Sequence, residues 1–226
     1  MKTCALIPAY NEEKNIVEVI DNLKSLDIFP VVVDDCSLDA TAELAEKSGA
    51  KVIRHRNNKG KGEAIKTGLR HILRNCPETE HIVLIDADMQ YHPKETPKIL
   101  QPLKNEEADF VSGFRNWSTV PFRHRLGNFV WKNAFNILFG TNFKDTNCGF
   151  MALTRNAAKK LKGIWGGYII ENALFIEAIK NNLKIKQVPV NVKYFEKRPV
   201  GNGIKTVSGV LYFIVREGLK YRLGIK

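Results

Sequence analysis

The sequence predicts an α/β fold built on a mainly parallel sheet with helices on both faces. Short apolar runs alternate with helix-like segments through the first half of the 226 residues, and the run 82–85 is apolar at every position. Such alternation places strands in parallel and helices over both faces, and an unbroken apolar strand is typical of a sheet covered on both sides. The length predicts one domain, 1–226, with halves 1–115 and 116–226.

In the first half, strands are expected at 4–7, 31–33, 51–53, 82–85 and 109–112. Asn11 is a typical helix cap, and Glu12 and Glu13 suit the first turn, where the helix dipole favours acids. Apolar residues then recur at helical spacing from Ile16 to Leu23. Further helices are expected at 39–47, capped by Asp39, and at 63–74 and 94–104.

The second half is less regular. Helices are expected at 122–139 and 169–180, a loop and strand at 145–154, a strand at 184–195, and a basic, partly amphipathic helix at 205–221. The apolar side of 122–139 suits either packing on the sheet or a bilayer surface.

The chain is basic, with a net charge of +11, and residues 193–226 carry +6 of it. This charge favours anionic partners: nucleic acid, phosphorylated ligands or anionic lipid. The four cysteines lack the spacing of a metal or redox motif, which favours reduced thiols in the cytoplasm. No signal peptide is visible, and no apolar run reaches the ~18 residues of a membrane span. We therefore expect a protein that touches a membrane without crossing it.

Asp86-Ala87-Asp88-Met89-Gln90 directly follows the apolar strand 82–85. Two neighbouring carboxylates are unfavourable unless a cation or hydrogen-bond donors offset their charge. Mg²⁺ or Mn²⁺ accepts such oxygen ligands and keeps positions for phosphate oxygens. The pattern predicts a metal site at Asp86, Asp88 and Gln90; its alternative is a solvated turn.

Two other segments meet the same expected sheet edge. Asp34 and Asp35 end the second strand, and we favour Asp35 as an acceptor for base or ribose donors. The run 57–62, Asn-Asn-Lys-Gly-Lys-Gly, precedes a helix and suits either a phosphate-binding turn or an ordinary tight turn.

Five segments, in order, resemble motifs of family 2 glycosyltransferases with the GT-A fold. These are 7–13, 33–41 (with Cys36 where Gly is usual), 86–93, 145–150 (with Cys148 where Ser is common), and 195–198 followed by 203–205. The form Asp-Ala-Asp-x-Gln-x-x-Pro of 86–93 is similar to dolichyl- or polyprenyl-phosphate mannosyltransferases. The resemblance covers nearly the whole chain.

The resemblance implies roles for the matching residues. The residues implied to bind the nucleoside are Pro8, Tyr10, Glu12 and Asp35. Those implied to bind the metal and the diphosphate are Asp86, Asp88 and Gln90, and Ala87 completes the nucleotide-sugar-binding set. Arg115, Arg198 and Lys205 meet the donor diphosphate or the acceptor phosphate, and an arginine fork matches phosphate geometry. With Asp88, these three form the expected catalytic set. The alternative for Arg198 and Lys205 is a solvated basic surface.

Glu171 is followed by Asn172. In the family that the chain resembles, many enzymes that glycosylate hydroxyls have a pair of acids near this position, and here the second acid is missing. A hydroxyl nucleophile needs a base, whereas a phosphate is already an anion. The resemblance therefore implies an inverting, metal-dependent hexosyltransferase. The implied donor is GDP-mannose or UDP-glucose, and the implied acceptor is a polyprenyl or dolichyl phosphate at the cytoplasmic membrane face. It leaves open whether a separate membrane-protein anchor holds the enzyme there.

Three rival functions remain. The nearest is a family 2 enzyme with a saccharide or other hydroxyl acceptor. A nucleic-acid-binding module is suggested by charge alone, but the acids at the expected ligand edge would repel a phosphate backbone, so we expect no nucleic-acid partner. A nucleotide-sugar sensor without catalytic activity is the third.

Overall fold

The computed structural model describes residues 2–115, 122–161, 169–193 and 203–225, and for 122–127 and 203–207 it describes the backbone alone. The elements are β1 Thr3–Ala9, α1 Ile16–Lys24, β2 Phe29–Asp34, α2 Thr41–Lys47, β3 Lys51–Arg54, α3 Lys61–Asn75, β4 His81–Leu84, the 3-10 helix η1 Pro93–Glu95, α4 Thr96–Lys104, β5 Phe110–Arg115, α5 Phe122–Phe139, β6 Met151–Thr154, α6 Arg155–Lys160, α7 Ile170–Lys180, β7 Ile185–Val190 and α8 Gly203–Arg222.

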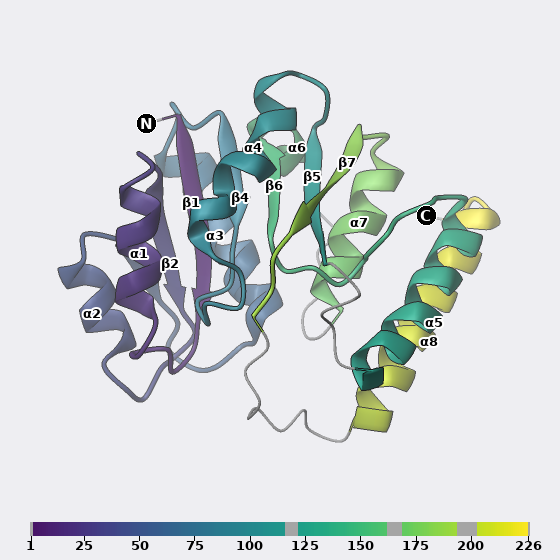
Figure 1. Cartoon of the computed structure of the whole chain (residues 1–226), viewed down its shortest axis with the longest axis horizontal. Helices are drawn as coiled ribbons and strands as arrows, with labels where there is room; N and C mark the ends of the chain where they lie inside the picture. The colour runs from purple at the N-terminus through teal and green to yellow at the C-terminus, as the bar shows by residue number, and fades with distance from the viewer. Residues whose placement is uncertain (1, 116–121, 162–168, 194–202, 226) are drawn as a thin grey trace.

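One sheet, in the order β3-β2-β1-β4-β6-β5-β7, joins both halves of the described chain. All its pairings are parallel except those of β6, which runs antiparallel between β4 and β5. Figure 1 shows the sheet with helices around it and with α5 and α8 together at its far end, beyond β7. The predicted α/β class with a mainly parallel sheet is confirmed.

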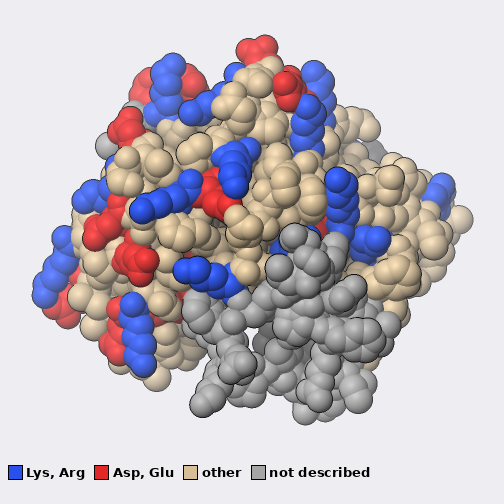
Figure 2. Space-filling view, viewed as in Figure 1, with Lys and Arg blue, Asp and Glu red and all other residues tan. Residues whose placement is uncertain are grey.

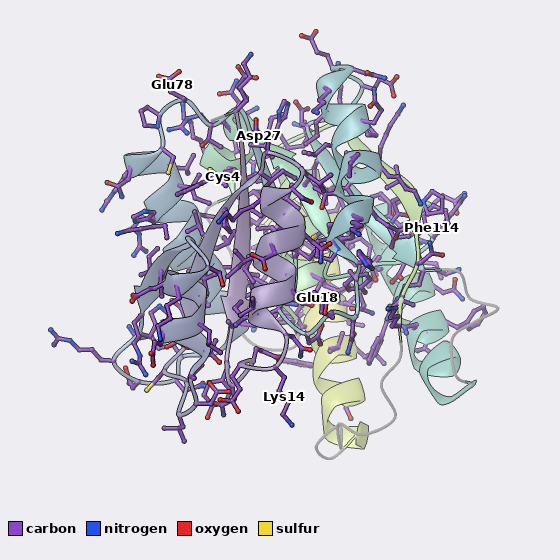
Figure 3. All side chains as sticks on the ribbon, turned by 60° about the vertical axis from the view of Figure 1, so that its left-hand side comes forward. Cys4, Lys14, Glu18, Asp27, Glu78 and Phe114 are labelled. Carbon is purple, nitrogen blue, oxygen red and sulfur yellow. The ribbon has the colours of Figure 1, made fainter. Side chains whose placement is uncertain are left out.

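Side chains alternate along the strands, so the sheet has a separate apolar core on each face. On one face Leu6 and Leu84 pack with α3, α5, α6, α7 and α8. On the other, Ile7 and Ile85 pack with α1, α2 and α4. Cys4, labelled on β1 in Figure 3, belongs to the first core and is buried. Helices therefore cover both faces, as predicted.

Three local expectations need correction. Asn11 does not cap a helix, because α1 begins only at Ile16. Asn11 has a positive φ of 54°, and its side-chain oxygen accepts a hydrogen bond from the backbone N–H of Leu38, so it joins two loops. The expected strand 184–195 ends at Val190 within the described residues, and its last two positions, 194 and 195, lie outside them. The short helix α6 was not predicted, although Thr154 caps it by accepting from the N–H of Ala157.

The expected cap of α2 also needs correction, because the N-cap is Ala40 and not Asp39. Asp39 lies one residue earlier, and its carboxylate still accepts a hydrogen bond from the N–H of Thr41, the first residue of α2. Gly49 adopts a positive φ of 84° just beyond the end of that helix. In the described part of the chain, no helix is long and apolar enough to cross a membrane.

Candidate functional site

A cavity of about 670 Å³ opens where β1, β2 and β4 end and α3 and α7 begin. Parallel strands bring their carboxyl ends to the same sheet edge, which is why these segments meet. The cavity walls include eight of the residues predicted from the sequence: Pro8, Tyr10, Glu12, Asp35, Asp86, Ala87, Asp88 and Gln90. They also include Gly60, Lys61, Ile170 and Glu171.

In the wall of this cavity, Lys61 bridges two carboxylates that lie far apart in the sequence. Its Nζ lies 2.7 Å from Oδ1 and 3.0 Å from Oδ2 of Asp86. The same Nζ lies 2.7 Å from Oε1 of Glu171. A single ammonium group therefore pairs with the acid after β4 and with the acid in the first turn of α7, and it offsets one of their two negative charges.

The charges in this cluster shift one another's pKa. Burial raises the pKa of Asp86, and the neighbouring charges of Asp88 and Glu171 raise it further, while Lys61 opposes the shift. Burial alone would lower the pKa of Lys61, but Asp86 and Glu171 outweigh burial, so the pKa of Lys61 is raised above its ordinary value. Lys61 is therefore firmly protonated, and it is the cation that these carboxylates hold.

The loop before β6 approaches Asp86 closely. A Cβ at Gly149 would collide with Oδ2 of Asp86 and lie 3.2 Å from Nζ of Lys61. Glycine at this position therefore leaves room for the Asp86–Lys61 pair against the backbone.

Asp88 and Gln90 form the turn that follows Asp86. Met89 between them has a positive φ of 58°, and the N–H of Gln90 donates to Oδ1 of Asp88 at 3.1 Å. The carbonyl of Gln90 accepts from the N–H of Lys193, which attaches the chain after β7 to this turn. Both side chains thus stand on a defined turn at the cavity wall.

Asp35 organises the glycine-containing turn before α3. Its carboxylate accepts from the backbone N–H groups of Lys59 and Gly60, at 2.9 and 2.6 Å, and lies 2.7 Å from Nδ1 of His55. Gly60 has a positive φ of 87°, as a tight turn requires. The run 57–62 is thus a loop held by Asp35 up to Gly60, followed by the first residues of α3, and Gly60 and Lys61 of this run line the cavity. The neighbouring Asp34 is fully buried and pairs with Arg54 instead.

Tyr10 and Glu12, from the first family-like segment 7–13, also line the cavity. Tyr10 is half exposed, whereas Glu12 is buried and its carboxylate accepts from the side-chain amide of Asn15. The backbone N–H of Glu12 donates to Oγ1 of Thr41 at 2.7 Å, which ties this loop to α2.

Arg115 stands apart from this cavity and pairs with Asp145. Its Nε and Nη2 donate to the two carboxylate oxygens at 2.6 and 2.9 Å, and the pair is almost fully buried. Arg115 Nη2 also lies 3.4 Å from Oδ1 of Asn128 on α5. The structure thus places Arg115 in a bidentate ion pair, and its expected contact with phosphate stays a prediction. Arg198 lies outside the described residues, and Lys205 is described by its backbone alone.

The described side chains of this site supply part of the coordination shell of a divalent cation. Within the described ranges, no three His, Cys, Asp or Glu side chains are grouped to enclose a metal ion. Mg²⁺ and Mn²⁺, however, are commonly bound through one or two carboxylates together with substrate phosphates. Asp86 already holds a cationic group in the cavity, and Asp88 and Gln90 supply further oxygens beside it. The donor set therefore suits a metal that arrives with a phosphate-bearing ligand.

Sequence patterns did not identify Lys61, which pairs with both Asp86 and Glu171, or His55, which contacts Asp35. The glycines of the run 57–62 predict a turn, but they give no sign that Lys61, in the same run, pairs with acids. The one local signal was a lysine at the first position of a helix, where a positive charge opposes the helix dipole and calls for a compensating acid.

Comparisons with known proteins agree with this geometry. The model of the family described as Glycosyl transferase family 2 matches residues 4–161. A UDP-N-acetylglucosamine–dolichyl-phosphate N-acetylglucosaminyltransferase of Methanococcus voltae is 31% identical over 216 residues, covering 84% of this chain and 85% of that protein. A dolichol-phosphate mannosyltransferase of Pyrococcus furiosus is 34% identical over 182 residues, covering 70% of this chain and 48% of that protein.

A solved structure shares the whole fold. Glucosyl-3-phosphoglycerate synthase of Mycobacterium tuberculosis, in complex with Mn²⁺, UDP and glucosyl-3-phosphoglycerate, superimposes with a TM-score of 0.76 at 25% identity, covering 100% of this chain and 81% of that chain. The predicted GT-A fold is confirmed. The cavity at the carboxyl ends of β1, β2 and β4, together with the family match over most of the chain, establishes that this protein belongs to glycosyltransferase family 2.

Proposed function

We propose that the enzyme transfers a hexose, with inversion, from a nucleoside diphosphate sugar to a polyprenyl or dolichyl phosphate at the cytoplasmic face of a membrane. The donor is GDP-mannose or UDP-glucose, and the cofactor is Mg²⁺ or Mn²⁺. In this proposal Pro8, Tyr10, Glu12 and Asp35 hold the nucleoside. Asp86, Asp88 and Gln90 hold the metal, which, when bound, stabilises the negative charge of the leaving diphosphate.

One observation carries the choice of acceptor: in the described part of the chain, the acid at the start of α7 is held in an ion pair and is not free to act as a base. Glu171 is held by Lys61 at 2.7 Å, so its carboxylate is committed to an ion pair. The next residue, Asn172, is fully buried, and its amide donates to Oδ1 of Asn147 at 2.6 Å. A hydroxyl nucleophile must lose a proton to a base, whereas a phosphate monoester is an anion near neutral pH. The relatives named for dolichyl phosphate support the same acceptor class.

Basic side chains complete the proposed reaction. Arg198 and Lys205 contact the diphosphate or the attacking phosphate, whose oxygen approaches the anomeric carbon opposite the leaving group. Arg115 joins them only on leaving its ion pair with Asp145. Their positive charge lowers the cost of bringing two phosphate groups together and stabilises charge that develops in the transition state.

A variant of Glu171 tests the acceptor class. Glu171→Gln keeps an oxygen that accepts from Lys61 but removes any base. We expect transfer to a polyprenyl phosphate to stay within about tenfold of wild type, whereas loss of a general base costs about 10²- to 10⁴-fold. Glu63→Gln, which alters a surface acid paired with Lys66 on the same helix as Lys61, is the matched control. A hundredfold or larger loss in Glu171→Gln alone would contradict the proposal.

A second candidate acceptor is a small phosphorylated hydroxy acid. Neighbouring structures of the same fold contain phosphoglyceric acid with UDP-glucose and Mn²⁺, which favours this alternative. Labelled UDP-glucose, GDP-mannose and UDP-N-acetylglucosamine should each be incubated with a short-chain polyprenyl phosphate or with 3-phosphoglycerate, with Mn²⁺ present. Label in the lipid fraction supports the proposal, and label only in the soluble acid supports the second candidate.

A further inference from the structure

Exposed apolar side chains are concentrated at one end of the molecule. Among the described residues, nine of the eleven large hydrophobic side chains that are exposed lie on α5, on α8 or within the three residues after α8. A concentration of this kind marks an interaction surface, whereas scattered apolar residues need no explanation.

The exposed residues form a stripe on each helix. On α8 and just beyond it, Tyr212, Val215, Leu219 and Leu223 recur at intervals of three and four residues, so they share one helical face. On α5, Val130 and Ile137 are two turns apart and also share a face. We call these six side chains the outer α5–α8 face. The buried residues of both helices, such as Phe135 and Ile214, face the core of the protein instead.

The two helices form one firmly packed unit. A Cβ at Gly218 would lie 2.6 Å from Cβ of Leu138, so the glycine lets the helices come close. Arg222 donates to the carbonyls of Ile137 and Leu138, both at 2.7 Å, which satisfies the end of α5. Figure 1 shows the two helices running side by side in the same direction.

The charge on this unit is almost entirely positive. The sequence of α5 contains three Lys or Arg residues and no acid, and that of α8 contains four against the single acid Glu217. Glu217 is buried and is neutralised by Lys180, Arg216 and Lys220 at 3.0–3.3 Å. In the view of Figure 2, the end of the molecule beyond β7 is mostly uncharged, with Lys or Arg and no visible Asp or Glu.

This unit is joined to the rim of the catalytic cavity. Asn128 of α5 accepts from the amide of Asn147, and Asn147 accepts from the amide of Asn172, the residue after Glu171. A chain of three asparagines therefore connects α5 to the start of α7. Whatever binds the outer α5–α8 face is held at a defined position relative to the cavity.

We propose that the outer α5–α8 face lies on an anionic phospholipid bilayer. This proposal rests on the proposed function, because the acceptor phosphate then reaches the cavity from the lipid surface. Apolar stripes flanked by Lys and Arg match a membrane interface with acidic headgroups. A second copy of the chain would match the apolar residues but would bring two positively charged surfaces together, which is unfavourable.

Vesicle flotation of the full chain tests the proposal. We expect binding to phosphatidylcholine vesicles that contain phosphatidylglycerol, weaker binding to phosphatidylcholine alone, and weaker binding at high salt. The double variant Leu219→Glu and Leu223→Glu should lose about tenfold or more in affinity for the anionic vesicles, because burial of one leucine is worth at least that factor. Leu38→Glu is the matched control, since Leu38 is 86% exposed on a different part of the molecule and should bind as wild type does.

Two further measurements separate the outcomes. Turnover of the double variant on a water-soluble short-chain polyprenyl phosphate should match wild type, which shows that the fold and cavity are intact. Sedimentation should give the same oligomeric state for the wild type and for the double variant. Absent vesicle binding, or a wild-type dimer that the double variant dissociates, would overturn the docking proposal. Vesicle binding without transfer to any polyprenyl phosphate would overturn the proposed function and leave the docking surface standing.

Discussion

Replacing Lys61 by Met tests whether this ammonium group and a divalent cation compete for Asp86. Nζ of Lys61 contacts both oxygens of Asp86, so a metal ion that binds there must first break these contacts. Met fills a similar volume without a charge. We therefore expect Lys61→Met to bind Mn²⁺ more tightly than wild type when no donor is present.

The magnitude follows from the contacts that the metal must break. A hydrogen bond to a charged group contributes about 1.5–3 kcal/mol, and each 1.4 kcal/mol is about tenfold in affinity. The variant should therefore bind Mn²⁺ about ten- to a hundredfold more tightly. Without metal it should be less stable by about 3 kcal/mol or more, because two partly buried carboxylates lose their counter-ion, and Mn²⁺ should restore that stability.

Calorimetric titration of nucleotide-free protein with Mn²⁺, together with chemical denaturation with and without the ion, measures both effects. Lys66→Met is the matched control, because Lys66 lies on the same helix and pairs with Glu63 at the surface. Unchanged or weaker Mn²⁺ binding by Lys61→Met would refute the reasoning, since Lys61 would then not occupy the position that the metal needs.

Four further outcomes are expected. Asp88→Ala should fold with equal or greater stability, since one of two neighbouring acids is removed, but titration with nucleoside diphosphate and Mn²⁺ should detect no metal-dependent binding. Arg198→Ala and Lys205→Ala should each slow turnover of a water-soluble polyprenyl phosphate by about ten- to a hundredfold at saturating donor, and rates near wild type would contradict a catalytic role. Asp145→Asn should lower the free energy of unfolding by about 3–5 kcal/mol, because it leaves its arginine partner buried without a counter-charge; a denaturation midpoint like that of wild type would contradict this. Burial raises the pKa of Cys4 from 9.0 to about 11, so the unfolded thiol ionises first, and stability should fall between pH 9 and 11 by about 1 kcal/mol per pH unit more in wild type than in Cys4→Ala.

Local sequence was sufficient to predict most of the elements and the edge at which the site lies. Pro8, Asp35 and Asp86 lie at or just beyond the carboxyl ends of β1, β2 and β4. Parallel strands bring these ends to one edge of the sheet. Alternation of strand and helix also determined that helices cover both faces. These are properties of short segments and chain direction, so they can be inferred without knowing which distant segments touch.

Only the tertiary structure decided how charged side chains that are far apart in the sequence pair. Lys61 and Glu171 are 110 residues apart, and they meet because α3 and α7 pack on the same face of the sheet. Arg115 and Asp145 form a buried pair because the loop before β6 returns to the end of β5. Asn11, a plausible cap in the sequence, instead bonds to the loop after β2. No periodicity or short motif encodes these partners, since each depends on the packing of segments far apart in the chain.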